Sequence, residues 1–167
     1  MSDSEKNLRE AFAGESQANR KYLAFAKKAD EEGQTGVAKL FRAVAAAETI
    51  HAHNHLNVLK GVKSTLENLK EASGGEHFEF TKMYPAFLVK SKEEKQNAAT
   101  QSFHWANEVE KVHGVLYENA IKALEGGGKL QDKDYYLCEK CGYTIADAAP
   151  DKCPVCGAKK EAFFKVS

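Results

Sequence analysis

Hydrophobic residues recur at every third or fourth position along most of the first 125 residues, which is the spacing of one face of an α-helix. The pattern predicts four long helices, at about residues 4–32, 36–61, 65–90 and 93–125. Only three prolines occur in the chain, at positions 85, 150 and 154, so almost this whole region is free to be helical. Long helices with short connections predict a mainly α protein built on a four-helix bundle.

Capping residues mark the ends of the predicted helices. A serine followed three residues later by a glutamate can form a capping box, in which each side chain accepts a hydrogen bond from a free backbone N–H. Three such pairs open predicted helices: Ser2 with Glu5, Ser64 with Glu67, and Ser91 with Glu94. Glycines that can end helices stand at positions 33, 36 and 61.

A weak internal repeat relates the two halves of the helical region at an offset of 62 residues. The matching pairs are Tyr22 and Tyr84, Phe41 and Phe103, Glu48 and Glu110, and His51 and His113. We therefore expect the bundle to be a duplicated helical hairpin. The third predicted helix falls one residue out of this frame around Glu76.

The segment EGGGKLQDKD, residues 125–134, interrupts the helical pattern with three glycines and several charges, which is typical of a hinge. We expect a helical bundle over residues 1–125, a hinge over 126–134, and a small domain over 135–167. The last of these is too short to be stable on a hydrophobic core alone, so it should need a bound metal.

Composition narrows the class of protein. Acidic and basic residues number 24 each, so no net charge favours nucleic acid or an anionic membrane. No apolar run approaches the roughly 18 residues that suggest a membrane span. The first residues, MSDSEKNLRE, lack the layout of a signal peptide, so we expect a cytoplasmic protein.

Carboxylates and histidines interrupt the apolar faces of the predicted helices. The second and fourth helices each place Glu-x-x-His, Glu48 with His51 and Glu110 with His113, in the middle of an apolar face. On the other two helices the corresponding faces carry Glu15, Glu76 and Glu79. Five carboxylates in a bundle core would be costly unless cations neutralised them.

Glutamate from two helices and Glu-x-x-His from two others is the ligand set of di-iron and di-manganese carboxylate bundles. The alternative is that these residues are surface charges or hydrogen-bonded core groups. A single Glu-x-x-His would favour that alternative, whereas two at a constant offset favour the metal site. We expect the remaining histidines to lie outside it: His53, His77 and His104 in solvent, and His55 in a packing role.

All four cysteines lie in two Cys-x-x-Cys pairs, Cys138 with Cys141 and Cys153 with Cys156. A glycine follows each pair and permits a tight turn that points backbone amides at the sulfurs. Four thiolates at this spacing predict a tetrahedral site for zinc or iron. The spacing does not choose between the metals, but a redox-capable carboxylate bundle in the same chain favours iron.

The whole chain resembles rubrerythrin, a ferritin-like bundle followed by a rubredoxin-like domain. The motifs that carry the resemblance are GESQANRKY (14–22), AETIH (47–51), GEHFEFTKMYP (75–85), EKVH (110–113), CEKCGY and CPVCG. The resemblance implies a di-iron centre, oxo-bridged when oxidised, and a mononuclear iron held by the four cysteines. The implied di-iron ligands are Glu15, Glu48, His51, Glu76, Glu79, Glu110 and His113, with Tyr22 and Tyr84 donating hydrogen bonds to the carboxylates. Only 11 residues separate the cysteine pairs, fewer than in free-standing rubredoxins.

The resemblance also implies peroxidase activity: reduction of hydrogen peroxide to water in oxidative stress defence. Electrons would come from an external donor such as rubredoxin and an NAD(P)H-dependent reductase. The alternatives are a ferritin-type ferroxidase, which has no need of the cysteines, and an electron carrier or zinc-ribbon adaptor, which has no need of seven other ligands.

The resemblance implies a homodimer as well. The hinge begins ~22 Å along the helix axis from Glu110, and the segment from 126 to about 137 could stretch to ~40 Å. We therefore expect the cysteine domain to lie far from its own di-iron site unless it folds back, and to serve the site of the neighbouring subunit in a head-to-tail dimer.

Overall fold

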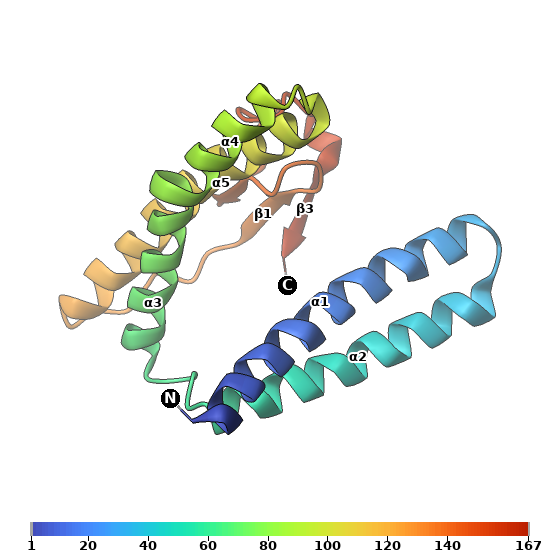
Figure 1. Ribbon diagram of the computed structural model, residues 1–167. Coiled ribbons are helices and arrows are strands. Elements are labelled where there is room, and N and C mark those ends of the chain that lie inside the picture. Colours follow the sequence, from blue (N-terminus) through green and yellow to red (C-terminus); the bar gives the residue numbers. More distant parts are fainter. Residues whose placement is uncertain (1, 167) are drawn as a thin grey trace. The chain divides into compact units, whose positions relative to one another are not determined.

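The computed structural model describes residues 2–166, which form two compact units, one ending at Lys63 and the other beginning at Ser64. The first unit is a hairpin of two antiparallel helices, α1 (Asp3–Glu31) and α2 (Thr35–Val58), which lie side by side along their lengths (Figure 1). Ser2 caps α1, because its hydroxyl accepts a hydrogen bond from the backbone N–H of Glu5. Gly33 ends α1 with a positive φ of 73°.

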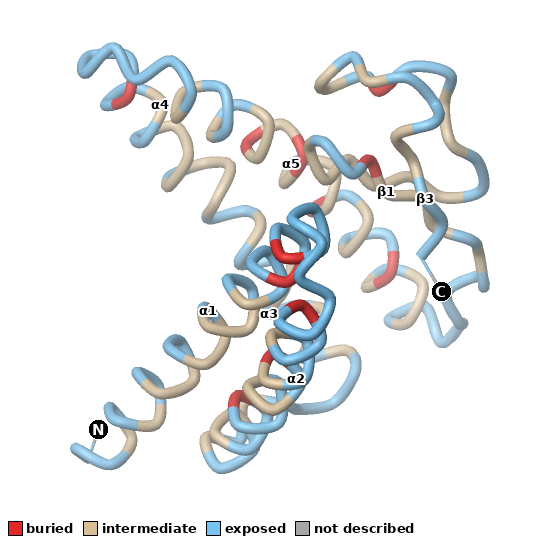
Figure 2. Tube along the Cα trace, turned by 90° about the vertical axis from the view of Figure 1, so that its right-hand side faces the viewer, coloured by how far each residue is buried: buried red, intermediate tan, exposed pale blue. Residues whose placement is uncertain are grey.

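Small residues form the contact between α1 and α2. Ala38, Ala45 and Ala52 are buried at intervals of seven residues along α2, and Ala26 and Ala29 are buried on α1. In Figure 2, α1 and α2 are mostly tan or pale blue, with only short red segments where residues are buried. The predicted inward face of α2 is therefore only partly buried within the hairpin. Val37 and Val58 on α2 are exposed by 44% and 66%.

The second unit begins with a further helical hairpin. Its first arm is α3 (Thr65–Phe78), one π-helical turn (Glu79–Met83) and α4 (Tyr84–Glu93), and its second arm is α5 (Asn97–Glu125). Ser64 and Glu67 form the predicted capping box at the start of α3. The capping box predicted for Ser91 and Glu94 is wrong. Ser91 is buried inside α4, where its hydroxyl lies 2.8 Å from that of Thr100, and α5 starts only at Asn97.

The internal repeat is confirmed in three dimensions. Rings of Tyr22, Phe25 and Phe41 form a cluster in the first hairpin, with centroids 5.5–6.2 Å apart. Residues 84, 87 and 103 form its counterpart in the second, with centroids 5.4–6.3 Å apart. The connecting turns match as well, because Lys95 takes the left-handed conformation of Gly33, with a φ of 57°.

The π-helical turn explains why the third predicted helix leaves the frame of the repeat. Tyr22 follows Glu15 by seven positions, whereas Tyr84 follows Glu76 by eight. A π turn accommodates one additional residue within a helix. The turn at Glu79–Met83 lies between these two positions, so both Glu76 and Tyr84 keep the places of their counterparts.

The cysteine domain is a three-stranded antiparallel sheet with the order β2-β1-β3. The strands are β1 (Tyr135–Cys138), β2 (Thr144–Ala146) and β3 (Phe163–Val166), and a short 3₁₀ helix, η2 (Lys160–Ala162), precedes β3. The domain belongs to the second unit, in which β2 contacts α5. Between residues 2 and 166, no helix combines the length and apolar character that a membrane crossing requires.

Candidate metal centres

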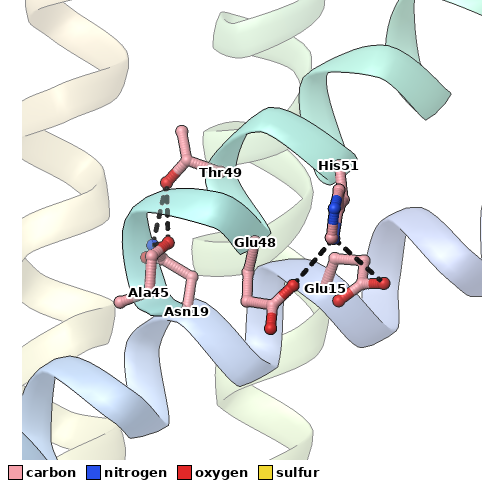
Figure 3. A network of polar contacts seen from close by, with 6 residues as sticks. All are labelled: Glu15, Asn19, Ala45, Glu48, Thr49 and His51. Atoms are coloured by element: carbon pink, nitrogen blue, oxygen red, sulfur yellow. Dashed lines mark hydrogen bonds and ion pairs between the residues drawn. The ribbon is translucent and has the colours of Figure 1, made fainter. Parts of the chain in front are cut away.

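The first hairpin brings three of the predicted ligands together. We call Glu15, Glu48 and His51 the hairpin cluster; one ligand atom of each lies within 4.8 Å of the others. Nδ1 of His51 is 2.9 Å from Oε2 of Glu48 and 3.9 Å from Oε1 of Glu15 (Figure 3). Glu48 and His51 share a face of α2 because they are three residues apart, and Glu15 reaches them from α1.

Asn19 holds the two helices in register beside this cluster. Its Nδ2 donates to the backbone carbonyl of Ala45, at 2.7 Å, and to Oγ1 of Thr49, at 2.9 Å (Figure 3). Asn19 lies one turn after Glu15 on α1, and its partners flank Glu48 on α2. These hydrogen bonds therefore fix the position of the Glu15 carboxylate relative to that of Glu48 along the helix axes.

The second unit repeats the arrangement. We call Glu76, Glu110 and His113 the α5 cluster; its ligand atoms also lie within 4.8 Å of one another. Nδ1 of His113 is 2.6 Å from Oε2 of Glu110 and 3.9 Å from Oε1 of Glu76, nearly the distances found in the hairpin cluster.

The carboxylates of the α5 cluster repel one another. Burial, followed by the charge of Glu110, raises the pKa of Glu76 to about 7. Burial and the same neighbour also raise the pKa of Glu79, which adjoins the cluster at the start of the π turn. A cation would relieve this repulsion, so the charges of the cluster favour metal binding.

His113 and Tyr84 respond to the same charges. A hydrogen bond to Glu110 raises the pKa of His113 above its usual value, against the effect of burial. Burial and the charge of Glu79 raise the pKa of Tyr84. The hydrogen-bonding roles of Tyr84 and Tyr22 toward ligand carboxylates stay predictions.

The remaining histidines lie as expected. His53, His77 and His104 are exposed, and His55 is partly buried near the end of α2.

The four cysteines form a preorganised site. Sγ of Cys138 is 3.6 Å from that of Cys156, and Sγ of Cys141 is 3.5 Å from that of Cys153. A tetrahedral metal with bonds of ~2.3 Å to sulfur separates its ligands by ~3.8 Å, so the site fits an iron or zinc ion with little adjustment. Burial raises the pKa of Cys141 and Cys156. Burial is also the largest single effect on Cys153, but hydrogen bonds with the backbone of Cys156 and Val155 and with the side chains of Cys141 and Cys156 together lower its pKa.

The cysteine domain folds back along α5 of its own chain. Nε2 of His113 lies 3.0 Å from Oγ1 of Thr144 in β2, and Lys140 lies over the ring of Trp105. The domain therefore meets the condition of folding back that the sequence left open, whereas the head-to-tail dimer and transfer between subunits stay predictions. Sequence reasoning missed Thr144 and Lys140. Neither belongs to a helical pattern or to a cysteine motif.

Comparisons with known proteins identify both parts of the chain. The family model for rubrerythrin matches residues 6–121, and that for the rubredoxin-like domain of rubrerythrin matches residues 136–164. Rubrerythrin-2 of Clostridium acetobutylicum is 34% identical, covering 93% of this chain and 92% of that one. Nigerythrin of Nitratidesulfovibrio vulgaris is 35% identical, covering 95% of this chain and 84% of that one.

A solved structure of nigerythrin agrees with the fold. The fully reduced, all-ferrous state of that protein matches with a TM-score of 0.58 at 33% identity, covering 99% of this chain and 88% of that one. The expected fold class is confirmed: helices of the ferritin-like type followed by a rubredoxin-like domain. The glutamate and histidine ligands of a di-iron centre and a four-cysteine iron site are both present. The chain therefore belongs to the rubrerythrin family.

Proposed function

We propose that this protein is a non-haem di-iron peroxidase of oxidative stress defence. It reduces hydrogen peroxide to water with electrons delivered through its rubredoxin-like iron site. One observation carries the proposal: two clusters with the same Glu-x-x-His geometry occur in one chain with a preorganised four-cysteine site. A redox reaction needs both a centre that reacts and a route by which electrons reach it. The resemblance to rubrerythrin implies that the two kinds of site act together in this way.

We assign the di-iron centre to both clusters together with the carboxylate beside the π turn. The proposed ligands are Glu15, Glu48, His51, Glu76, Glu79, Glu110 and His113, and the mononuclear iron is assigned to Cys138, Cys141, Cys153 and Cys156. When bound, the di-iron centre supplies the two electrons that, with two protons, convert one hydrogen peroxide into two water molecules.

The charge of the ligands suits two oxidation states. Five carboxylates carry about −5, against +6 for two ferric and +4 for two ferrous ions, so the net charge stays near zero in both. Burial, followed by repulsion from Glu110, raises the pKa values of Glu76 and Glu79, and bound cations would offset both effects.

The two histidines are held differently. His113 is bonded through both ring nitrogens, to Glu110 and to Thr144, and its side chain is 25% exposed. Within the first hairpin, His51 contacts its neighbours only through Nδ1, to Glu48 and Glu15. We infer that His113 is a fixed ligand. His51 and Glu79 would serve different oxidation states of a bound iron, because imidazole suits ferrous iron and carboxylate suits ferric iron.

We propose that electrons arrive one at a time from an external donor such as rubredoxin, itself reduced by an NAD(P)H-dependent enzyme, and that the protein is a homodimer. A ferritin-type ferroxidase would share the helices but would not need the cysteines. An electron carrier or zinc-ribbon adaptor would not need two Glu-x-x-His clusters.

The test is donor-dependent peroxide reduction by the iron-loaded protein. We expect NADH consumption with rubredoxin and its reductase to require both peroxide and intact cysteines, so Cys138→Ser with Cys141→Ser abolishes it. Glu118→Gln, at an exposed position of α5, is the matched control. A colourless protein with zinc at the cysteines would favour the adaptor. Oxidation of iron by oxygen at the same rate in the cysteine variants as in wild type would favour the ferroxidase.

A further inference from the structure

The π turn is a departure of the second helical hairpin from the first, and Glu79 is its first residue. In α1 the places that correspond to Glu79 on the two sides of the frame shift are held by Gln17 and Ala18, neither of which carries a charge. The additional carboxylate and the additional residue of the helix therefore occur together. Whatever holds the π turn also determines where Glu79 lies.

Two local features favour an irregular turn at this point. Pro85 has no backbone N–H, and in a regular α-helix its ring would clash with the carbonyl of Thr81, four residues earlier. The hydroxyl of Thr81 donates to the carbonyl of His77, at 2.5 Å, and bonds of this kind often bend helices. The backbone N–H of Tyr84 then donates to the carbonyl of Glu79, five residues earlier, which closes the π turn. These features act along one helix, so they do not by themselves place Glu79 against α5.

The contact that crosses from the π turn to α5 joins Phe80 and Gly114. Gly114 is buried in α5, and a Cβ placed on it would lie 3.3 Å from Cε1 of Phe80. Carbon atoms in favourable contact lie ~3.5–4.0 Å apart, so any larger residue at this position would press on the ring. The same ring packs against that of His77, with centroids 5.0 Å apart. Phe80 is therefore held between its own helix and α5.

The glycine at position 114 is explained by the space that it leaves. Its backbone is helical, and glycine weakens a helix interior relative to alanine. In the first hairpin the corresponding residue is Ala52, which is also buried. There the facing helix, α1, is an uninterrupted α-helix from Asp3 to Glu31. The missing side chain at Gly114 therefore accompanies the π turn and the ring of Phe80.

Phe80 and Gly114 each adjoin a carboxylate. Phe80 directly follows Glu79, and Gly114 lies one turn after Glu110 on the same face of α5. Glu79 is partly buried, and its carboxylate interacts electrostatically with that of Glu110. Neighbouring residues of the π turn thus face neighbouring turns of α5. A shift of the ring relative to Gly114 would therefore move Glu79 relative to Glu110.

We propose that Phe80 and Gly114 are positioning residues, which hold the π turn against α5 and thereby set the place of the Glu79 carboxylate beside Glu110. Neither residue carries a group that binds metal, so each acts through Glu79. The consequence for bound iron rests on the proposed function, in which Glu79 serves ferric iron. Loss of its position should then loosen iron in the oxidised protein.

Gly114→Val tests the contact, because the added atoms would press on Phe80. Gly74→Val is the matched control, since Gly74 is exposed in α3 and an added Cβ would have nothing within 4 Å. In metal-free, full-length protein, we expect the backbone N–H of Tyr84 to exchange its hydrogen at least ~5-fold faster in Gly114→Val than in the control. Adding Phe80→Leu, which supplies a smaller side chain, should restore slow exchange. Equal exchange in Gly114→Val and Gly74→Val would overturn the proposal.

The second measurement is the rate at which a chelator removes iron from the oxidised protein. We expect Gly114→Val to raise this rate ~10-fold or more, as Glu79→Gln should. If the contact acts through Glu79, Gly114→Val adds nothing once Glu79→Gln is present, whereas a general loss of stability would add to its effect. Additive effects, or iron held as tightly in Gly114→Val as in Gly74→Val, would overturn the proposal.

Phe80→Ala replaces Gly114→Val if that variant does not fold. It removes the ring, so the same faster exchange at Tyr84 and the same dependence on Glu79 are expected, and wild-type values for both would overturn the proposal. Wild-type protein that holds iron but does not reduce peroxide would overturn the proposed function alone, because neither measurement uses peroxide.

Discussion

Nε2 of His113 lies 3.0 Å from Oγ1 of Thr144, so a residue of the α5 cluster and a residue of the cysteine domain share a hydrogen bond. The hydroxyl of Thr144 also donates to the carbonyl of Gly142, at 3.1 Å, which uses its only hydrogen. Thr144 must therefore accept from Nε2–H of His113. This tautomer leaves Nδ1, on the side of Glu110, available to a metal.

Thr144→Val should therefore weaken iron binding by His113, because valine cannot accept the hydrogen bond that orients the ring. Loss of such a partner typically lowers metal affinity ~10- to 100-fold. Competition with a chelator measures the effect, and Thr144→Ser, which keeps the hydroxyl, should retain most of the affinity. Equal affinity in the valine variant and wild type would contradict this role.

Glu48→Ala and Glu110→Ala should each abolish peroxidase activity. Each carboxylate lies within 3 Å of its neighbouring histidine, and its removal opens the site and lowers its negative charge. Iron content per chain and peroxide turnover are the measurements, with Glu118→Ala as the control. If either variant kept its irons and most of its activity, the assignment of the di-iron ligands would be wrong.

His51→Ala should leave the oxidised form assembled and impair turnover. Within the first hairpin His51 is held only through Nδ1, whereas His113 is held through both ring nitrogens, and looser positioning suits a ligand needed mainly in the reduced state. Absorption of the oxidised protein should be near normal while the steady-state rate falls. Normal turnover would show that the exchange of Glu79 for His51 does not occur here.

The metal-free protein should lose stability as the pH rises from about 4.5 to 7. Glu76 binds its proton more tightly in the folded state, where its pKa is about 7 against the usual 4.5, so deprotonation in this window favours unfolding. The raised pKa of His113 acts in the same direction at higher pH, because the charged imidazole that Glu110 stabilises is then lost.

Thermal unfolding of the metal-free protein, followed by circular dichroism across this pH range, measures the effect. Glu76→Gln should flatten the profile, because glutamine imitates the protonated carboxyl at every pH. A wild-type melting temperature that rises toward pH 7, or the same profile in both proteins, would show that the repulsion between Glu76 and Glu110 does not control stability.

The sequence predicted most of the helical structure because its signals are local. Glu-x-x-His at a constant offset placed Glu48 and His51 on one helix face, and Glu110 and His113 on another, with no knowledge of tertiary structure. The capping box at Ser64 is local in the same way. At Ser91 the same signal failed, since a tertiary contact with Thr100 buries the hydroxyl and α4 continues past it.

Features that depend on distant residues could not be predicted. The frame shift at Glu76 was visible in the sequence, but its cause is a π turn, for which single sequences carry no clear signal. The contact of Thr144 with His113 joins residues 31 apart across a glycine-rich linker, so no periodic pattern records it. The length of the hinge limits how far the cysteine domain can reach, whereas its packing against Trp105 and Val109 determines where it lies.

The most direct test of the whole account is a rapid-mixing experiment under anaerobic conditions. Protein with all its irons reduced is mixed with one equivalent of hydrogen peroxide, and the ferric–thiolate absorption is followed together with that of the di-iron centre. The account predicts that the di-iron centre is oxidised first. The cysteine-bound iron then gives up its electron, so the ferric–thiolate absorption rises second. Glu110→Ala should suppress both changes. Direct oxidation of the cysteine-bound iron by peroxide, at the same rate in Glu110→Ala as in wild type, would contradict it.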